Sequence, residues 1–261
     1  MIRLSICSVF AMNQPLEAML KACADSGYAR LELVCLGEGQ HIDITQWDAA
    51  ELREACEAYG IEPIALYTKP IDVHADDRFR ASLEYIKYAI DVAAEIPCGR
   101  IVFSPLLPRE NYDYGRLAEG CRELADYIGE RDVTICLENH HEWPMSYTRD
   151  YATLFEMIDD PRIGATIDTG HFTSSKVDMI DMIGRFGGRI KHVHLKERRG
   201  TDHVPFGEGE TNMPAIIERL RESGYDGYAS VELESLPSEE IPRQLPTTRE
   251  YCERVLGVDS T

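Results

Sequence analysis

Four residues of kinds that bind metal ions recur in the C-terminal half of the chain, each at the end of a short apolar run typical of a β-strand. They are Glu138 in VTICLENHH, Asp168 in GATIDTGH, His194 in IKHVHLKE and Glu232 in YASVELE. Successive members are 30, 26 and 38 residues apart, about the length of a strand, a helix and two loops. Because parallel strands bring their C-terminal ends together, the four side chains are predicted to converge. Carboxylates and one imidazole suit Mn²⁺, Mg²⁺ or Co²⁺, so the sequence predicts a metalloenzyme.

Short β-branched, apolar runs alternate with amphipathic helical patterns eight times along the chain. The apolar runs predict strands over residues 3–8, 29–34, 62–67, 100–104, 134–138, 164–168, 191–195 and 228–232. The helical patterns predict helices over 14–26, 45–59, 78–96, 112–128, 147–158, 177–186 and 213–223, before a final acidic stretch over 238–256. Eight such units in 261 residues match an α/β fold of the (β/α)8 TIM-barrel type, whose active site lies at the C-terminal ends of the strands.

A doubly wound open sheet is the alternative fold for alternating strands and helices. A dinucleotide-binding sheet needs a glycine-rich turn after its first strand, and the sequence there reads SVFAMNQP, without glycine. The barrel is therefore the preferred prediction. No linker, low-complexity tract or shift in composition divides the chain, so residues 1–261 are expected to form one domain.

The net charge of −19 limits the partners that we expect for this chain. Nucleic-acid binding usually requires a basic face, and no run rich in Lys or Arg is present. We therefore expect no nucleic-acid partner. An acidic chain suits a small substrate that is not strongly anionic.

The eight cysteines form no CxxC pair and lie mostly in apolar helix or strand patterns. Free thiols in such positions behave as small hydrophobic groups, which predicts reduced core residues in a cytoplasmic protein. The first residues, MIRLSICSVF, are typical of a strand and not of a signal sequence. No apolar run reaches 18 residues, so no membrane span is predicted.

Further polar residues lie close to the four candidate ligands. His171 follows Asp168 by three residues, across a glycine that permits a tight turn, and is a candidate contact for substrate or for a second metal ion. Side chains two apart on a strand share one face, which places His140 and Lys196 beside the ligands that precede them. The segment LKERRGTDHVPFGEGE is typical of a functional barrel loop. It contains His203, which either contacts substrate or is an exposed loop histidine.

The motifs LEN, DTGH, HVHLKE, PFGEG and VELE, all within residues 134–234, resemble those of the xylose-isomerase-like TIM-barrel superfamily. This superfamily includes sugar isomerases, ketose 3-epimerases, inosose dehydratases, dehydroshikimate dehydratases and endonuclease IV. The resemblance implies a divalent metal ion held by Glu138, Asp168, His194 and Glu232. Such a ligand set admits Mn²⁺, our first choice, and also Mg²⁺, Co²⁺, Zn²⁺ or Fe²⁺. Relatives often form dimers or tetramers, so the resemblance is compatible with a homo-oligomer and does not fix the oligomeric state.

The epimerase branch of this superfamily implies the function that we expect first. It is a metal-dependent isomerase or epimerase that acts on a ketose or related polyol ketone through an enediolate. Glu138 and Glu232 would be the acid/base pair on opposite faces of the sugar, while the metal polarises the carbonyl. The resemblance also implies substrate contacts from His171 and from Arg199. Arg199 begins an Arg-Gly pair that lies one residue closer to His194 than in epimerases.

Glu32 lies in GYARLEL, which matches a GxxxxEL pattern common in the superfamily. It either reaches the mouth of the barrel as a substrate contact or ties loops together by an ion pair. The other histidines are expected to be structural, with His192 lower in the barrel than His194. They are His41, His74, His141 and His192.

A metal-dependent lyase is the alternative function at the same site. Lys196 is typical of dehydratase-like members with the motif HLKD, although Glu197 replaces the aspartate here. His140 is either an additional acid/base or a structural histidine. Such a lyase would dehydrate an inosose or dehydroshikimate, or cleave a 3-keto-glycoside.

Two other functions are less compatible with the sequence. An endonuclease IV-like site needs histidines at the ends of strands 3 and 4, which read LYTKP and FSPLLP, and an aspartate where Thr201 stands. A non-catalytic sugar-binding barrel, or a subunit that needs a partner, would not require the complete set of metal ligands.

Overall fold

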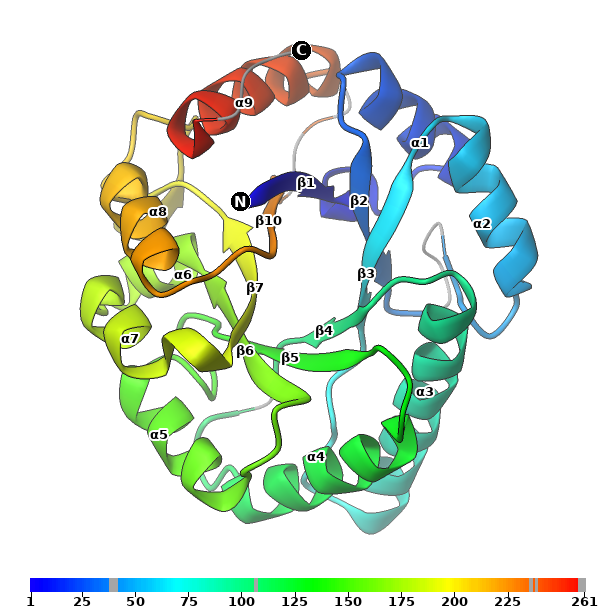
Figure 1. The fold of residues 1–261 in the computed structure, drawn as a ribbon, viewed down its shortest axis with the longest axis vertical. Helices are drawn as coiled ribbons and strands as arrows, with labels where there is room; N and C mark the ends of the chain where they lie inside the picture. The colour runs from blue at the N-terminus through cyan, green and yellow to red at the C-terminus, as the bar shows by residue number, and fades with distance from the viewer. Residues whose placement is uncertain (38–41, 106–107, 235–236, 238, 258–261) are drawn as a thin grey trace.

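The computed structural model describes residues 1–37, 42–105, 108–234, 237 and 239–257. Within these ranges eight parallel strands form a closed barrel, in the order β1-β10-β7-β6-β5-β4-β3-β2, and helices surround it (Figure 1). The predicted (β/α)8 barrel is confirmed. The barrel strands are β1 (Arg3–Cys7), β2 (Arg30–Cys35), β3 (Glu62–Thr68), β4 (Arg100–Phe103), β5 (Thr134–Glu138), β6 (Ile163–Asp168), β7 (Ile190–Leu195) and β10 (Tyr228–Val231).

Helices follow the strands as predicted, with some differences at their ends. The helices are α1 (Leu16–Asp25), α2 (Ala49–Ala58), α3 (Asp76–Glu95), α4 (Tyr114–Ile128), α5 (Thr148–Met157), α6 (Thr169–Ser174), α7 (Met179–Phe186), α8 (Met213–Glu222) and α9 (Ile241–Leu256). α2 begins four residues later than predicted because the Asp48 side chain accepts from Ala50 N at 2.7 Å and caps the helix there. Residue 238, where the last acidic stretch was expected to begin, lies outside the described residues.

Four short elements were not predicted. They are two 3₁₀ turns, η1 (Ser8–Ala11) and η2 (Gly187–Arg189), helix α6, and a hairpin of β8 (Arg198–Arg199) and β9 (Asp202–His203). α6 is too short to show helical periodicity, and its start is fixed by the Asp168 side chain, which accepts from His171 N at 2.6 Å.

An apolar core fills the layer between the strands and the helices. Leu31 and Leu33 on β2 and Leu83 and Ile86 on α3 are fully buried members of it. Truncating such a side chain to alanine typically lowers stability by about 2–5 kcal/mol. The eight cysteines are buried as free thiols, so their prediction as core residues is confirmed.

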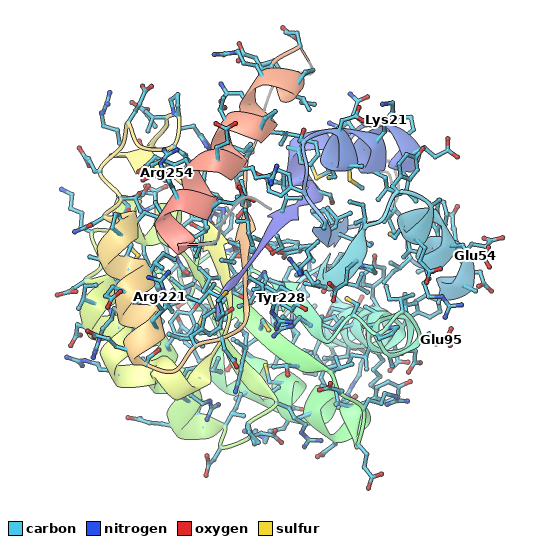
Figure 2. All side chains as sticks on the ribbon, turned by 45° about the horizontal axis from the view of Figure 1, so that its top comes forward. Lys21, Glu54, Glu95, Arg221, Tyr228 and Arg254 are labelled. Atoms are coloured by element: carbon cyan, nitrogen blue, oxygen red, sulfur yellow. The ribbon has the colours of Figure 1, made fainter. Side chains whose placement is uncertain are left out.

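The outer faces of the helices carry charge. Figure 2 shows exposed side chains on α1, α2, α3, α8 and α9 that project away from the barrel, including Lys21, Glu54, Glu95, Arg221 and Arg254. This pattern is the amphipathicity expected of helices that cover a barrel. None of the helices in the described ranges is both long and apolar enough to span a bilayer.

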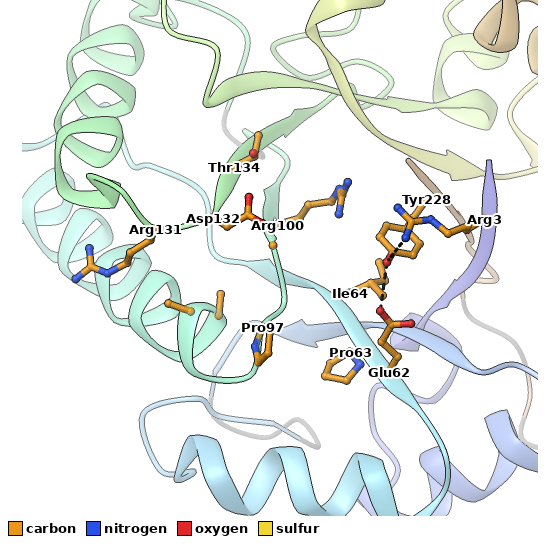
Figure 3. A pocket seen from close by; sticks show the side chains of 13 residues that line it. Arg3, Glu62, Pro63, Ile64, Pro97, Arg100, Arg131, Asp132, Thr134 and Tyr228 are labelled. Atoms are coloured by element: carbon orange, nitrogen blue, oxygen red, sulfur yellow. Dashed lines mark hydrogen bonds between the residues drawn. The ribbon is translucent and has the colours of Figure 1, made fainter. Parts of the chain in front are cut away.

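The N-terminal ends of the strands surround a cavity of about 550 Å³ (Figure 3). Arg3, Glu62, Arg100 and Tyr228, which begin four of the barrel strands, line it. The Arg3 guanidinium donates to the Tyr228 hydroxyl at 2.9 Å, and that hydroxyl donates to Glu62 Oε1 at 3.3 Å. We call this end the base of the barrel and the opposite end, where the strands finish, its mouth.

Candidate metal centre

The four residues singled out as metal ligands meet at the mouth of the barrel. Glu138 ends β5, Asp168 ends β6, His194 lies near the end of β7, and Glu232 directly follows β10. Each residue offers one potential ligand atom, and these four atoms all lie within 4.8 Å of one another. All four residues are buried. His194 Nδ1 is 2.5 Å from Glu138 Oε1 and 3.0 Å from Glu232 Oε2.

The charges of this cluster are not balanced by its hydrogen bonds. Among the described residues, neither Asp168 Oδ2 nor Glu232 Oε2 has a hydrogen-bond partner. Burial raises the pKa of Glu232 to about 8, even though Lys196 and His194 favour its ionised form. Burial disfavours the charged form of His194, but the carboxylates of Glu32, Glu138 and Glu232 hold its pKa well above its usual range. Three buried carboxylates and one imidazole that lie this close together thus fit a divalent cation.

Lys196 lies at the edge of the cluster, almost completely buried. Its Nζ donates to Glu234 Oε1 at 2.9 Å and forms ion pairs with Asp168 Oδ2 at 3.0 Å and Glu232 Oε1 at 3.2 Å. Burial alone lowers the pKa of Lys196, yet these carboxylates hold it well above its usual range. The ammonium group is therefore charged and directed at the ligand cluster.

The glycine of the DTGH motif, Gly170, leaves room for the Lys196 side chain and is not required by a tight turn. A Cβ on Gly170 would lie 2.6 Å from the Lys196 Cγ. Gly170 is absent from the described residues with positive φ, so its backbone does not require glycine. The sequence-based explanation of this glycine was wrong, because close approach between α6 and the end of β7 is what excludes a side chain.

Two predicted substrate contacts, His140 and His171, stack with ring centroids 3.8 Å apart. Burial lowers the pKa of His171 to about 3, so its imidazole is neutral near pH 7. Its Nε2 lies 3.1 Å from Lys196 Nζ and accepts from it, which places the proton of His171 on Nδ1. His140 donates through Nδ1 to the His141 carbonyl at 3.1 Å.

A hollow of about 160 Å³ opens beside the ligand cluster. Its polar side is formed by Tyr67, Glu138, His140, His171, Glu232 and Glu234. Its other side is mainly apolar and is formed by Cys7, Val9, Met12, Val34 and Leu36. No described Lys or Arg side chain lines this hollow. A second hollow of about 240 Å³ shares Glu232 and Glu234 with the first and extends past Lys196 and His203 toward α9.

Arg199 is not placed where the sequence analysis expected it. It is exposed, and its guanidinium donates to the Glu208 carbonyl; it lines neither of these two hollows in the described structure. Arg198 points inward instead, because adjacent residues of a strand face opposite sides. Its Nη2 donates to Glu234 Oε2 at 3.1 Å.

His203 and Glu32 have different surroundings. His203 is about half exposed, lines the second hollow and has its Nε2 3.3 Å from Glu234 Oε2. Glu32 is fully buried and contacts His192 and His194, so it neither reaches the mouth nor ties loops together. His192 is fully buried beside Glu32, below the ligand cluster. His41 lies outside the described residues.

Three polar residues at the site, Tyr67, Arg198 and Glu234, were not among the predicted site residues. Tyr67 donates from its hydroxyl to Glu138 Oε2 at 2.8 Å. Glu234 forms ion pairs with Lys196 and Arg198, and Lys196 lowers the pKa of Glu234 to about 2 although burial opposes this. The alternation in VELE places Glu234 on the same face as Glu232 and was the available signal. For Tyr67 the available signal was its place in the LYT run, next to the C-terminal end of β3.

A closed (β/α)8 barrel with three buried carboxylates and one imidazole at its mouth defines a class of metal-site TIM barrels. The family model described as "Xylose isomerase-like TIM barrel" matches residues 20–251. The chain therefore belongs to this family, and the resemblance inferred from the sequence motifs is confirmed.

Two kinds of curated relative are similar in sequence. An inosose dehydratase of Lacticaseibacillus casei is 30% identical over 149 residues, covering 50% of each chain. A fructoselysine 3-epimerase of Shigella flexneri is 25% identical over 239 residues, covering 84% of this chain and 85% of the relative. The chain thus matches about half the length of the inosose dehydratase.

Solved structures share the fold at lower sequence identity. The D-allulose 3-epimerase from Methylomonas sp. in complex with D-allulose has a TM-score of 0.80 and 17% identity, covering 97% of this chain and 96% of the other. The IOLI protein with a bound zinc atom has a TM-score of 0.81 and 18% identity, covering 100% of both chains.

Proposed function

We propose that this protein is a divalent-metal-dependent isomerase or epimerase of a ketose or related polyol ketone. The observation that carries the proposal is that Glu138 and Glu232 belong to the ligand cluster and also line the hollow beside it. One pair of carboxylates is thereby available to hold a cation and to exchange protons with a bound molecule. Similarity to a fructoselysine 3-epimerase supports this choice.

Glu138, Asp168, His194 and Glu232 are the proposed metal ligands. When bound, the metal would polarise a substrate carbonyl and its neighbouring hydroxyl, which makes the adjacent C–H more acidic. Three oxygen-donating residues and one imidazole favour Mn²⁺ as our first choice. The zinc atom in the similar IOLI structure keeps Zn²⁺ as a candidate.

The two glutamates are the proposed acid/base pair, and each has its own supporting contact. Tyr67 donates to Glu138 Oε2 at 2.8 Å, while Lys196 Nζ lies 3.2 Å from Glu232 Oε1. These contacts orient two carboxylates that come from separate strands. One carboxylate removes a proton from the substrate carbon and the other returns one, which inverts or moves the carbonyl-adjacent centre.

The lining of the hollow favours an uncharged substrate. Its described polar side contains three carboxylates and two histidines, and His171 is neutral near pH 7. A phosphate or carboxylate group would meet like charge there without an arginine or lysine from the described lining. We therefore favour a free ketose or inosose over dehydroshikimate, whose carboxylate lacks a partner in this hollow.

A lyase remains the second candidate, favoured by Lys196. Its charged Nζ lies next to both Glu232 and His171, and it also lines the second hollow. It is therefore placed to protonate a leaving hydroxyl or glycosyl oxygen that extends in that direction. Similarity to inosose dehydratases supports this alternative.

Mass spectrometry in D₂O tests both candidates. The purified chain is incubated with ketoses, inososes, dehydroshikimate and 3-keto-glycosides, with Mn²⁺ or with EDTA. An isomerase or epimerase adds about one mass unit for each carbon that exchanges its proton with solvent, at an unchanged skeleton and only with metal. Loss of water or of an aglycone would instead establish the lyase. If an unchanged substrate incorporates deuterium equally in EDTA, the metal-dependent proposal is wrong.

We further propose that the chain is one domain and works in the cytoplasm. Both a monomer and a homo-oligomer are compatible with this proposal. The eight buried free thiols support a reducing compartment. Size-exclusion chromatography with light scattering distinguishes a monomer from an oligomer.

A further inference from the structure

We infer that Glu32 is a positioning residue that determines which nitrogen of His194 faces the metal ligands. This inference rests on the proposed metal site and goes beyond it, because Glu32 is not a member of the ligand cluster. It assigns a function to a fully buried carboxylate that neither touches the hollow nor forms an ion pair with Lys or Arg in the described structure.

Glu32 reaches His194 across the interior of the barrel. It lies on β2, while His194 lies on β7, and β1 and β10 separate the two strands around the wall (Figure 1). The pairing of β2 with β3 shifts register between Leu31 and Glu32, the kind of irregularity that redirects a side chain. Both carboxylate oxygens of Glu32 then lie 3.0 Å from His194 Nε2.

This contact fixes the tautomer of His194. An ionised carboxylate can only accept hydrogen bonds, so His194 Nε2 must carry a proton. In the neutral imidazole the lone pair is then on Nδ1, which faces Glu138 Oε1 at 2.5 Å and Glu232 Oε2 at 3.0 Å. Without a metal ion, a second proton on Nδ1 satisfies the two carboxylates that face it, and a cation bound in the cluster would take the place of that proton. Glu32 therefore presents Nδ1 as the ligand nitrogen.

A second histidine holds Glu32 in place. His192 Nε2 lies 2.8 Å from Glu32 Oε2, and it also lies 3.1 Å from Ser230 Oγ. Ser230 Oγ is in turn 2.9 Å from Ser5 Oγ. All these groups are fully buried, so no water competes for the carboxylate. The network restricts Glu32 to one orientation, which is what a positioning residue requires.

A second metal ion is the alternative explanation for this group. Glu32, His192 and His194 also offer ligand atoms within 4.8 Å of one another. The described structure supplies only these three ligands in a fully buried place, fewer than the four or more that Zn²⁺, Mg²⁺ or Ca²⁺ usually take. The contacts of 2.8–3.0 Å are ordinary hydrogen-bond lengths. We therefore expect one metal ion per chain.

Glu32→Gln, with Asp150→Asn as matched control, tests the inference. Asp150 is also a buried carboxylate, but it pairs with Arg109 at 2.8 and 2.9 Å and has no described contact with a ligand residue. Metal affinity is measured by competition with a chelator, and thermal unfolding is recorded in EDTA. We expect Glu32→Gln to bind Mn²⁺ and Zn²⁺ about 10–100-fold more weakly. Asp150→Asn should lose stability without losing affinity.

A measurement on the unmodified protein covers the case in which Glu32→Gln does not fold. In the zinc-loaded protein labelled with ¹⁵N-histidine, NMR should show His194 protonated on Nε2 and metal-bound through Nδ1. Metal bound through Nε2, or wild-type affinity in Glu32→Gln, would overturn the inference. So would two metal ions per wild-type chain with one lost in the variant. If the wild-type chain binds no divalent metal, both the proposed function and this inference fail. If it binds metal but Glu32→Gln binds equally well, only this inference fails.

Discussion

The two ends of the barrel differ in how their charged side chains are paired. At the base, charged groups have direct partners. The guanidinium carbons of Arg3 and Arg100 lie 3.9 Å and 4.8 Å from the centre of the Tyr228 ring (Figure 3). Arg100 Nε donates to the Lys191 carbonyl at 2.9 Å, and the Tyr228 hydroxyl links Arg3 to Glu62. Arg3, Glu62 and Arg100 therefore each have a polar partner at this cavity.

At the mouth, like charges are concentrated. Glu138, Asp168 and Glu232 lie within one small buried cluster, and oxygens of Asp168 and Glu232 lack hydrogen-bond partners in the described structure. Lys196 balances only part of this charge. The base is thus stabilised by contacts within the protein, whereas the mouth concentrates carboxylates as our proposed metal site requires, in agreement with the usual division of function in TIM barrels.

The largest expected effect is on turnover in Glu232→Gln. The amide keeps the shape of the side chain but cannot act as a base, so turnover should fall by about 10²–10⁴-fold. The measurement is the initial rate with whichever substrate the D₂O screen identifies, and circular dichroism verifies the fold. Glu222→Gln, on the exposed surface of α8, is the control and should keep full activity. Near-normal activity of Glu232→Gln would show that the acid/base assignment is wrong.

Asp168→Asn should mainly weaken metal affinity. The variant removes one negative charge from the proposed ligands, and an amide oxygen can still cap α6. We expect the loss to equal or exceed the roughly 10–100-fold seen when groups that support ligands are removed. Isothermal titration with Mn²⁺ measures it. Unchanged affinity would mean that the metal, if bound, lies elsewhere than in this cluster.

The mouth should also give the metal-free protein a distinctive pH dependence. Folding raises the pKa of Glu232 from about 4.5 to about 8, so the folded state holds more protons than the unfolded state between these values. Stability from this group is present below about pH 4.5 and is lost as the pH rises to 8. In EDTA, wild type should therefore lose stability relative to Glu232→Gln by up to about 1.4 kcal/mol per pH unit in that window. Equal pH profiles in denaturant titrations would contradict the predicted charge imbalance.

The smallest effect is expected at the base, in Tyr228→Phe. The variant removes the hydroxyl that accepts from Arg3 and donates to Glu62 but keeps the ring that contacts Arg3 and Arg100. Stability should fall by about 0.5–1.5 kcal/mol, measured by urea unfolding. Metal affinity and turnover should not change. A loss of either would show that the two ends are coupled and that the comparison is too simple.

The strands and the convergence of the ligands could be predicted because they depend on local patterns. Each barrel strand begins and ends within one residue of its prediction, since a buried parallel strand is a short apolar run with turn residues on both sides. Once the strand ends were known, the positions of Glu138, Asp168 and His194 followed from the geometry of a barrel.

The remaining features depend on contacts that sequence periodicity does not report. Arg198 and Arg199 are adjacent, and only the two-residue strand β8 decides which of them points inward. Glu32 faces the interior at a register shift between β2 and β3, so its partners, about 160 residues away, were not visible in the sequence. Gly170 is explained by Lys196, which follows β7 and packs against the start of α6.

The pairing of β1 with β10 also has a consequence for how the site is assembled. This pairing closes the barrel and joins residues 225 positions apart, such as Ser5 and Ser230. Contacts of such long range form slowly, because much chain entropy is lost before they contribute. Glu232 directly follows β10, so we expect it to be the last ligand to reach the cluster. Metal uptake during refolding should then report the moment at which the two ends of the chain meet.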